Sequence, residues 1–333
     1  MSNLYLIRNL LSLKAAKSID EQYFYHGSVF SVIDTDYQLK NIILNNLEET
    51  KINVVSTVKF PVYGAGFNIL KQRQYIKEAK DEVEKLLSHL STTQLFITYP
   101  MHFDSYVYYI IAKKLRIKVC FYEEGPCFYR AGLTKQYDIN TKKDALRRLY
   151  FELCGLKRGY SFNADNWYCS LPIKEKHRLI RLKYKKVNLP SDVKRVFLSR
   201  PVSDDYPEIK ITDEVNAIKK FYDFECDGEI LYLKFHPRES ETKRDLINDG
   251  LLKLGIQIAI IEGDMPSEDV IFSMEAGAVC GYDTTTLVYA NNINNNVKVY
   301  SVLNSITGKD HSGFLTECYQ EYKLKYNHIY MIE

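Results

Sequence analysis

The sequence predicts an α/β fold built from two Rossmann-like halves, and three observations support this prediction. The chain has 333 residues, which is long enough for two domains of ordinary size. In both halves of the chain, short apolar runs alternate with amphipathic helical patterns, as is typical of a parallel sheet with helices on both faces. A more irregular stretch at 159–192 interrupts this alternation and ends in KKVNLPSDVK, which reads as a hinge.

In the first half, five apolar runs are predicted as strands. In chain order they are NLYLIR (3–8), SVFSVID (28–34), INVVSTV (52–58), QLFITYP (94–100) and KVCFYEEG (118–125). Helical patterns lie between them: LLSLKAAKSI, LKNIILNNLEE, a long amphipathic stretch at about 68–90, and SYVYYIIAKKL. Since each strand is followed by a helix, the strands are expected to run parallel.

In the second half, the same alternation predicts five further strands. They are VFLSRP (196–201), ILYLKFHP (230–237), IQIAIIEG (256–263), AVCGYD (278–283) and VKVYSV (297–302). Helices are expected at roughly 212–223, 240–254, 267–275 and 284–292, and in the C-terminal tail. We therefore expect an N-terminal domain over 1–187, a C-terminal domain over 188–310, a helical tail over 311–333, and a ligand in the cleft between the domains at the carboxyl ends of the strands.

Composition and charge narrow the function classes. The net charge of +3 argues against a dedicated nucleic-acid binder. Seven cysteines without a CxxC pair or metal-ligand spacing indicate a reducing compartment, and no segment approaches the ~18 consecutive apolar residues of a membrane span. Because the N-terminus also lacks a signal-peptide pattern, we expect a cytoplasmic protein. Basic residues gathered at 142–186 are compatible with a solvated face or with peripheral contact with an anionic inner membrane.

Polar side chains that carry chemistry follow three of the predicted strands. Glu123 and Glu124 end the fifth N-terminal strand, His236 ends the second strand of the other half, and Asp283 with three threonines (284–286) follows its fourth strand. Each feature alone has an ordinary structural interpretation, as a solvated loop, a turn residue or a helix cap. Together they lie where an α/β fold binds its ligands.

As a set, these residues suit group transfer from a phosphate-activated donor to an alcohol. A helix N-terminus with hydroxyl groups binds phosphate. An imidazole beside that phosphate stabilises it as a leaving group, and a carboxylate can deprotonate the acceptor hydroxyl. Two adjacent acids raise each other's pKa, which makes one of them a better base.

Four short motifs resemble those of bacterial sialyltransferases. Glu123-Glu124-Gly125 resembles the acidic-acidic-Gly motif, Lys234-Phe235-His236-Pro237 resembles the His-Pro motif, and Asp283-Thr284-Thr285-Thr286 lies where those enzymes keep a Ser/Thr pair. MPSEDVIF (265–272) resembles the segment in which a Glu after Pro holds the donor ribose. The order agrees over roughly 1–310, and the overall pattern is closest to the polysialyltransferase and lipooligosaccharide sialyltransferase group.

The resemblance implies a GT-B fold and inverting transfer, without a metal or other cofactor, from a CMP-activated nonulosonic acid to a surface glycan such as lipooligosaccharide, O-antigen or capsule. It implies Glu123 as general base, with Glu124 as rival or supporting acid, and His236 as the residue that assists departure of CMP. The implied donor-binding residues are Lys234, Pro237, Glu268, Asp283, Thr284, Thr285 and Thr286. Among these, Thr284 and Thr285 would bind the phosphate and Glu268 the ribose. The chain looks shorter than a typical polysialyltransferase, which favours the addition of one or a few residues.

Several alternatives stay open at this stage. His102 and Gly66 are candidate acceptor residues, although a structural histidine and a tight turn are the commoner explanations of such residues. Asp34-Thr35-Asp36 matches the metal motif of a GT-A glycosyltransferase, which would bind Mn²⁺ or Mg²⁺. A GT-B transferase that uses CMP-Kdo shares the donor chemistry, and a non-catalytic nucleotide-sugar or glycan-binding protein would share the fold without turnover.

Overall fold

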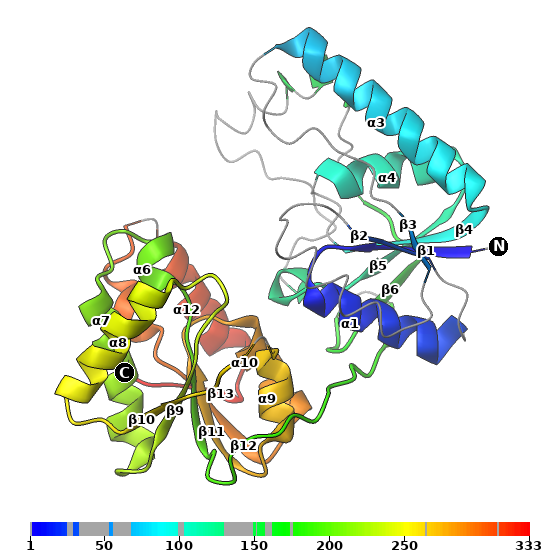
Figure 1. Ribbon diagram of the computed structural model, residues 1–333. Coiled ribbons are helices and arrows are strands. Elements are labelled where there is room, and N and C mark those ends of the chain that lie inside the picture. Colours follow the sequence, from blue (N-terminus) through cyan, green and yellow to red (C-terminus); the bar gives the residue numbers. More distant parts are fainter. Residues whose placement is uncertain are drawn as a thin grey trace. The chain divides into compact units, whose positions relative to one another are not determined.

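The chain folds into two compact units, Met1–Lys183 and Tyr184–Glu333, in the computed structural model of Figure 1. The structure describes residues 2–24, 29–32, 53–55, 68–98, 103–129, 149–150, 152–156, 162–173, 176–263, 265–311 and 313–333. Each unit contains one parallel sheet and its own hydrophobic core. The predicted α/β class with two Rossmann-like halves is confirmed.

The first unit contains a seven-stranded parallel sheet in the order β3-β2-β1-β4-β5-β6-β7. Its strands are β1 Ser2–Ile7, β2 Val29–Val32, β3 Asn53–Val55, β4 Thr92–Ile97, β5 Lys118–Tyr122, β6 Asn166–Cys169 and β7 His177–Leu179. The order runs outward from β1 on one side and continues from β4 on the other. The boundary between β1 and β4 is therefore the topological switch point, where such sheets bind ligands.

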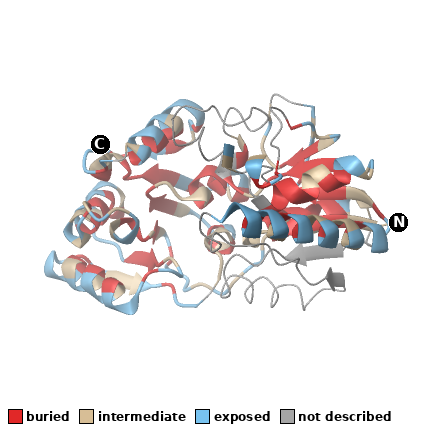
Figure 2. Cartoon of the chain, turned by 90° about the horizontal axis from the view of Figure 1, so that it is seen from above, coloured by how far each residue is buried: buried red, intermediate tan, exposed pale blue. Residues whose placement is uncertain are grey.

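The helices of the first unit include one long amphipathic helix, α3. They are α1 Leu10–Ile19, the π-helix η1 Asp20–Phe24, α3 Ile69–His89, α4 Phe103–Lys114 and the short 3-10 helix η2 Pro126–Tyr129. Along α3 the buried residues recur at spacings of three and four, the period of an amphipathic helix: Gln72, Ile76, Ala79, Val83 and Leu87. Figure 2 shows a largely buried sheet in the first unit and, next to it, a long helix with an exposed outer side.

The second unit contains a six-stranded parallel sheet in the order β10-β9-β8-β11-β12-β13. Its strands are β8 Arg195–Leu198, β9 Leu231–Lys234, β10 Ile258–Ile260, β11 Gly277–Gly281, β12 Val297–Ser301 and β13 Ile329–Met331. Its helices are α6 Val202–Asp205, α7 Ile211–Phe221, η3 Tyr222–Cys226, α8 Glu241–Lys253, α9 Ser267–Ser273, α10 Thr285–Ile293, α11 Asn304–Thr307 and α12 Phe314–Lys325. Here the switch point lies between β8 and β11.

Three strands were not foreseen from the sequence. β6 and β7 lie within the stretch at 159–192 that was interpreted as irregular, and β13 follows α12 in the tail for which only a helix was expected. These strands have three or four residues each, too few to show a periodic pattern. Hydrogen bonding to a neighbouring strand stabilises them instead, as in the parallel pairing of β13 with β12. The expected helix LKNIILNNLEE lies outside the described residues.

The described part of the chain contains no helix that is both long and apolar enough to cross a membrane. The six cysteines whose surroundings the structure describes are all free and buried, at positions 120, 154, 169, 226, 280 and 318.

Candidate active site

The register of the strands in the second unit places three charged or ionisable residues at the same distance beyond the ends of their strands. Leu198 of β8 pairs with Lys234 of β9 on one side and with Gly281 of β11 on the other. Two residues beyond this row lie Arg200, His236 and Asp283, at the carboxyl edge of the sheet. These three residues lie close to the switch point between β8 and β11, which is where a doubly wound sheet binds ligands.

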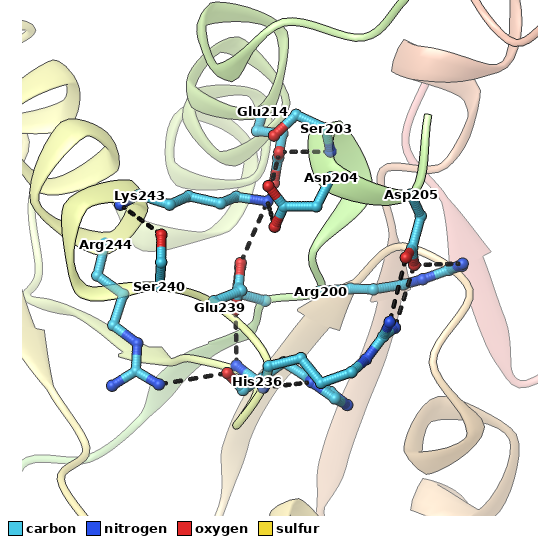
Figure 3. Close-up of polar contacts among 12 residues, drawn as sticks. Arg200, Ser203, Asp204, Asp205, Glu214, His236, Glu239, Ser240, Lys243 and Arg244 are labelled. Atoms are coloured by element: carbon cyan, nitrogen blue, oxygen red, sulfur yellow. Dashed lines mark hydrogen bonds and ion pairs between the residues drawn. The ribbon is translucent and has the colours of Figure 1, made fainter. Parts of the chain in front are cut away.

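His236 lies in a tight turn between β9 and α8. The N–H of Glu239 donates to the carbonyl of His236 at 3.0 Å, and Pro237 occupies the second position of this turn, where its fixed φ is favourable. The N–H of Arg238 donates to the ring Nδ1 of His236 at 3.1 Å (Figure 3). Because Nδ1 is an acceptor, the neutral ring carries its proton on Nε2, which is the atom left to donate.

The surroundings of His236 favour the neutral imidazole. Burial lowers the pKa of His236, and the positive charges of Arg238, Arg200 and Lys234 lower it further, against a smaller opposing effect of Asp205. An anion that neutralised these cations would raise the pKa of the ring again.

A chain of ion pairs crosses the switch point beside His236. Arg200 pairs with Asp283 and, at 3.5 Å, with Asp205, which also accepts two hydrogen bonds from Arg238 at 3.2 and 3.1 Å. Figure 3 shows Asp205 between the two guanidinium groups. Sequence reasoning did not identify Arg200 or Asp205. The available signal was Arg200, a charged residue near the end of a predicted strand, but its partner Asp283 lies 83 residues away.

The threonines cap and anchor α10. Thr284 is the N-cap residue, and its hydroxyl accepts from the N–H of Thr286 at 3.4 Å. The hydroxyl of Thr286 is buried and donates to Glu268 Oε1 of α9 at 2.9 Å. Thr285 begins the helix and is half-buried, as are Asp283 and Thr284. The predicted donor residues Glu268 and Thr286 therefore contact each other directly.

Lys234 is a buried residue and not a surface cation. Its side chain is buried, and its Nζ donates to the carbonyl of Gly263 at 2.6 Å, which ties β9 to the loop after β10. Pro237 is exposed in the turn described above. These two residues shape the loops around His236.

The two adjacent acids of the first unit point into different surroundings. The side chain of Glu123 is fully buried: its carboxylate accepts from the Tyr129 hydroxyl, from the Ser170 N–H at 3.1 Å and from the Ser170 hydroxyl at 3.0 Å. Burial and the Glu123 charge raise the pKa of Tyr129 well above its usual range. The Glu124 side chain is 12% exposed, and its Oε2 lies 4.0 Å from Arg8 Nε. Of the two carboxylates, Glu124 is therefore the one open to solvent.

Residues at the end of β1 hold this acid pair in place. Arg8 forms an ion pair with Asp104 of α4 at 2.5 Å, which joins the loop after β1 to the start of α4 across the switch point. Asn9 caps α1 and donates from Nδ2 to the carbonyl of Glu124 at 3.0 Å. Sequence reasoning missed these contacts because Arg8 and Asp104 lie 96 residues apart in the chain.

Some predicted residues have no structural description here. His102, Gly66 and the Asp34-Thr35-Asp36 motif lie outside the described residues. Within the described ranges, no group of three or more His, Cys, Asp or Glu side chains is arranged to hold a metal ion. In the basic stretch at 142–186, Arg178 stacks over Tyr23 and Tyr168, with its guanidinium carbon 5.4 and 5.9 Å from the ring centroids.

Comparison with known proteins identifies the family. The family model for alpha-2,8-polysialyltransferase matches residues 3–303 of this chain. Among curated proteins, none matches by sequence.

Solved structures share the fold at low sequence identity. A UDP-GlcNAc 2-epimerase from Methanocaldococcus jannaschii superposes with a TM-score of 0.57 at 11% identity, covering 100% of this chain and 89% of that chain. A UDP-glucosyltransferase from Polygonum tinctorium superposes with a TM-score of 0.52 at 10% identity, covering 87% of this chain and 78% of that chain. Spinosyn rhamnosyltransferase SpnG, complexed with thymidine diphosphate, superposes with a TM-score of 0.51 at 10% identity, covering 96% of this chain and 89% of that chain. These similarities confirm the GT-B fold, and the GT-A alternative is wrong.

Proposed function

Because the chain belongs to the alpha-2,8-polysialyltransferase family and is a glycosyltransferase of GT-B fold, we propose that it transfers a sialic acid, or a related nonulosonic acid, from a CMP-activated donor to a hydroxyl group of a surface glycan. The observation that carries this proposal is the register of the second unit. It brings His236, Arg200 and the start of α10 to the same edge of the sheet, at its switch point. Phosphate binding at such a helix N-terminus is a common arrangement.

The donor half of the reaction is assigned to the second unit. The phosphate of CMP would bind near Thr284 and Thr285, with Glu268 on the ribose. His236 would donate a hydrogen bond from Nε2 to the phosphate oxygen that leaves the anomeric carbon, which stabilises the charge on that oxygen. That oxygen keeps the electron pair of the broken bond. The cations that lower the pKa of His236 in the free protein would add to the stabilisation of the leaving phosphate, and the neutral ring keeps its Nε2 proton in this step.

The acceptor half of the reaction is assigned to the first unit. The acceptor oxygen attacks the anomeric carbon as the bond to phosphate breaks, and its proton passes to a carboxylate. We assign this carboxylate to Glu124, the rival kept open by the sequence, because Glu123 is buried and its oxygens accept from Tyr129 and Ser170. In this assignment Glu123 fixes the loop that carries Glu124. A single displacement of this kind inverts the anomeric centre and is proposed to need no metal ion.

The base assignment is tested with two amide variants. Glu124→Gln should lower kcat by about two or more orders of magnitude, as the loss of a general base does. Glu123→Gln should have the smaller effect on kcat and the larger effect on melting temperature, since it disturbs a buried hydrogen-bond network. CMP should raise the melting temperature of the Glu124 variant as it does that of the wild type. If Glu123→Gln abolishes turnover and Glu124→Gln keeps it, Glu123 is the base.

The donor class is tested by a screen of CMP-sugars with EDTA present. Turnover of a CMP-nonulosonic acid with a glycan acceptor supports the proposal, whereas turnover of CMP-Kdo alone would assign the chain to the alternative transfer reaction. Loss of turnover in EDTA, with recovery on adding Mg²⁺, would contradict the metal-independent mechanism.

A further inference from the structure

Beneath the His236 turn lies a second layer of polar side chains that the proposed mechanism does not use. Glu239 ends the turn, and its side chain is 0% exposed. One carboxylate oxygen, Oε2, accepts from the backbone N–H of His236 at 2.6 Å, and Oε1 accepts from the hydroxyl of Ser199 at 2.8 Å. Ser199 follows β8 and His236 follows β9, so this one carboxylate joins the ends of two neighbouring strands.

A buried lysine holds the same carboxylate from the other side. Lys243 of α8 is 3% exposed, and its Nζ lies 3.6 Å from Glu239 Oε1 and 2.9 Å from Glu214 Oε1 of α7. Figure 3 shows this lysine reaching between the carboxylates, with Asp204 at its outer side, 3.5 Å away. The Glu214 oxygen also accepts from the N–H of Ser203 at 2.9 Å. The second layer thus links α6, α7 and α8 to the His236 turn.

Stability alone is a poor reason for such an arrangement. Removing a carboxylate from water is costly, and buried ion pairs are frequently no better for stability than apolar residues of similar size. Burial raises the pKa of Glu239, which expresses this cost directly. The arrangement does fix the direction of the hydrogen bonds of Glu239, because its two oxygens have partners in the loops after two different strands, β8 and β9.

We propose that Glu239 is a positioning residue for His236, and that Ser199 and Lys243 hold its carboxylate so that the turn presents the ring Nε2 to the donor phosphate. The inference rests on the proposed role of His236 in transfer. Two contacts fix the histidine from opposite ends: Glu239 accepts from its backbone N–H, and the Arg238 N–H donates to its Nδ1. The second contact exists only while the turn keeps its shape. Without Glu239, therefore, neither the orientation of the His236 ring nor its Nε2–H tautomer should remain fixed.

The experiment compares three variants of the full chain by kinetics and by imidazole ¹⁵N NMR. Glu239→Leu removes both acceptor oxygens and should lower kcat by about 10²-fold with little change in KM, the effect of a reacting group misplaced by about 1 Å. Glu239→Gln keeps one acceptor oxygen for the His236 N–H and should recover most of this loss. Glu225→Leu is the matched control: Glu225 is a poorly exposed carboxylate with partners Arg195, Lys298 and Tyr300, and Arg195 begins β8 at the opposite edge of the sheet.

The NMR readout separates positioning from general stability. The chain has seven histidines, and the His236 signal is assigned by its absence in His236→Ala. In the wild type and in Glu225→Leu we expect the Nε2–H tautomer of His236, and in Glu239→Leu a mixture of both tautomers. An unchanged tautomer in Glu239→Leu, or equal loss of kcat in Glu239→Leu and Glu225→Leu at matched melting temperatures, would overturn the proposal.

Two further variants keep the test decisive. If Glu239→Leu does not fold, Ser199→Ala removes only the hydroxyl that holds Oε1, and it should lower kcat several-fold with a measurable shift in the tautomer ratio; no shift refutes the positioning role. Turnover of His236→Ala at the wild-type rate would refute the proposed function instead. The His236 tautomer in Glu239→Leu could still be interpreted in that case, because the NMR measurement does not depend on turnover. The two failures are therefore distinguishable.

Discussion

At the scale of single residues, the informative property of this site is the charge around one imidazole. Burial and the cations Arg238, Arg200 and Lys234 lower the pKa of His236 from its usual value near 6.5. A phosphate group bound at the ring favours the imidazolium, so the pKa of His236 in the CMP complex should be higher than in the free protein. CMP should then bind more tightly as the pH falls from the pKa of the complex to the pKa of the free protein, measured as Kd by calorimetry between about pH 8 and 5.

The control for this prediction is His236→Ala. CMP itself takes up a proton on its phosphate near pH 6, so a part of the pH dependence belongs to the ligand. The contribution of the ligand remains in His236→Ala, so it can be subtracted from the pH dependence of Kd measured for the wild type. Identical pH profiles of Kd in the two proteins would show that the phosphate does not bind beside His236.

The same histidine gives a stability prediction whose sign follows from its lowered pKa. The unfolded chain binds this proton more readily than the folded one, so His236 favours folding above the unfolded-state pKa near 6.5, and this contribution is lost as the pH falls through the folded pKa. His236→Asn should therefore weaken the fall of the unfolding free energy below about pH 6. Urea unfolding at several pH values measures it, and an unaltered acid limb of the curve would contradict the burial of the ring.

At the scale of elements, helix α1 shows how a cap also supports a loop of the candidate site. The side chain of Asn9 accepts from the Ser12 N–H at 2.7 Å, the Ser12 hydroxyl accepts from the Asn9 N–H at 3.0 Å, and Asn9 Nδ2 reaches the Glu124 carbonyl. Asn9→Ala should lower the unfolding free energy by about 1 kcal/mol through the lost cap. Asn9→Ser keeps a capping oxygen but has no amide for Glu124, so it should restore stability while turnover stays reduced.

Thermal melting and initial rates of the two Asn9 variants measure both effects. Equal turnover in Asn9→Ser and wild type would mean that the contact with the Glu124 carbonyl does not support the acid pair. Equal stability of Asn9→Ala and wild type would mean that the capping box adds nothing to α1.

How much of this fold could be predicted depended on the length of each element. The helix α3 has an amphipathic period that sequence reasoning detects, and β4 contains a recognisable apolar run, whereas β7 and β13 are too short for either signal. Strand ends led to Glu124, His236 and Asp283 because parallel strands gather their carboxyl ends at one edge. Their ion partners could not be predicted in this way. Arg8 and Asp104 meet only after strand order and register are known.

At the scale of the whole molecule, the separate cores imply that the two units fold independently. The main buried clusters each belong to one unit: Leu4, Ile97 and Trp167 lie in the first, Phe197, Leu233 and Tyr300 in the second. The linker segment that begins the second unit is bound within it. The N–H groups of Lys185 and Val187 donate to Asp269 and Ser273 of α9, and the Tyr184 ring lies 5.9 Å from that of Phe272.

A fragment of residues 184–333 should therefore fold alone and bind CMP, because it keeps its complete sheet and every residue assigned to the donor. We expect one cooperative melting transition that CMP shifts upward, by about 2.7 kcal/mol of unfolding free energy at 100 times Kd. Its Kd should agree with that of the full chain, and it should show no transfer, since Glu123 and Glu124 are absent. A folded fragment that does not bind CMP while the full chain does would place part of the nucleotide site in the first unit and would remove the assignment of donor binding to the second.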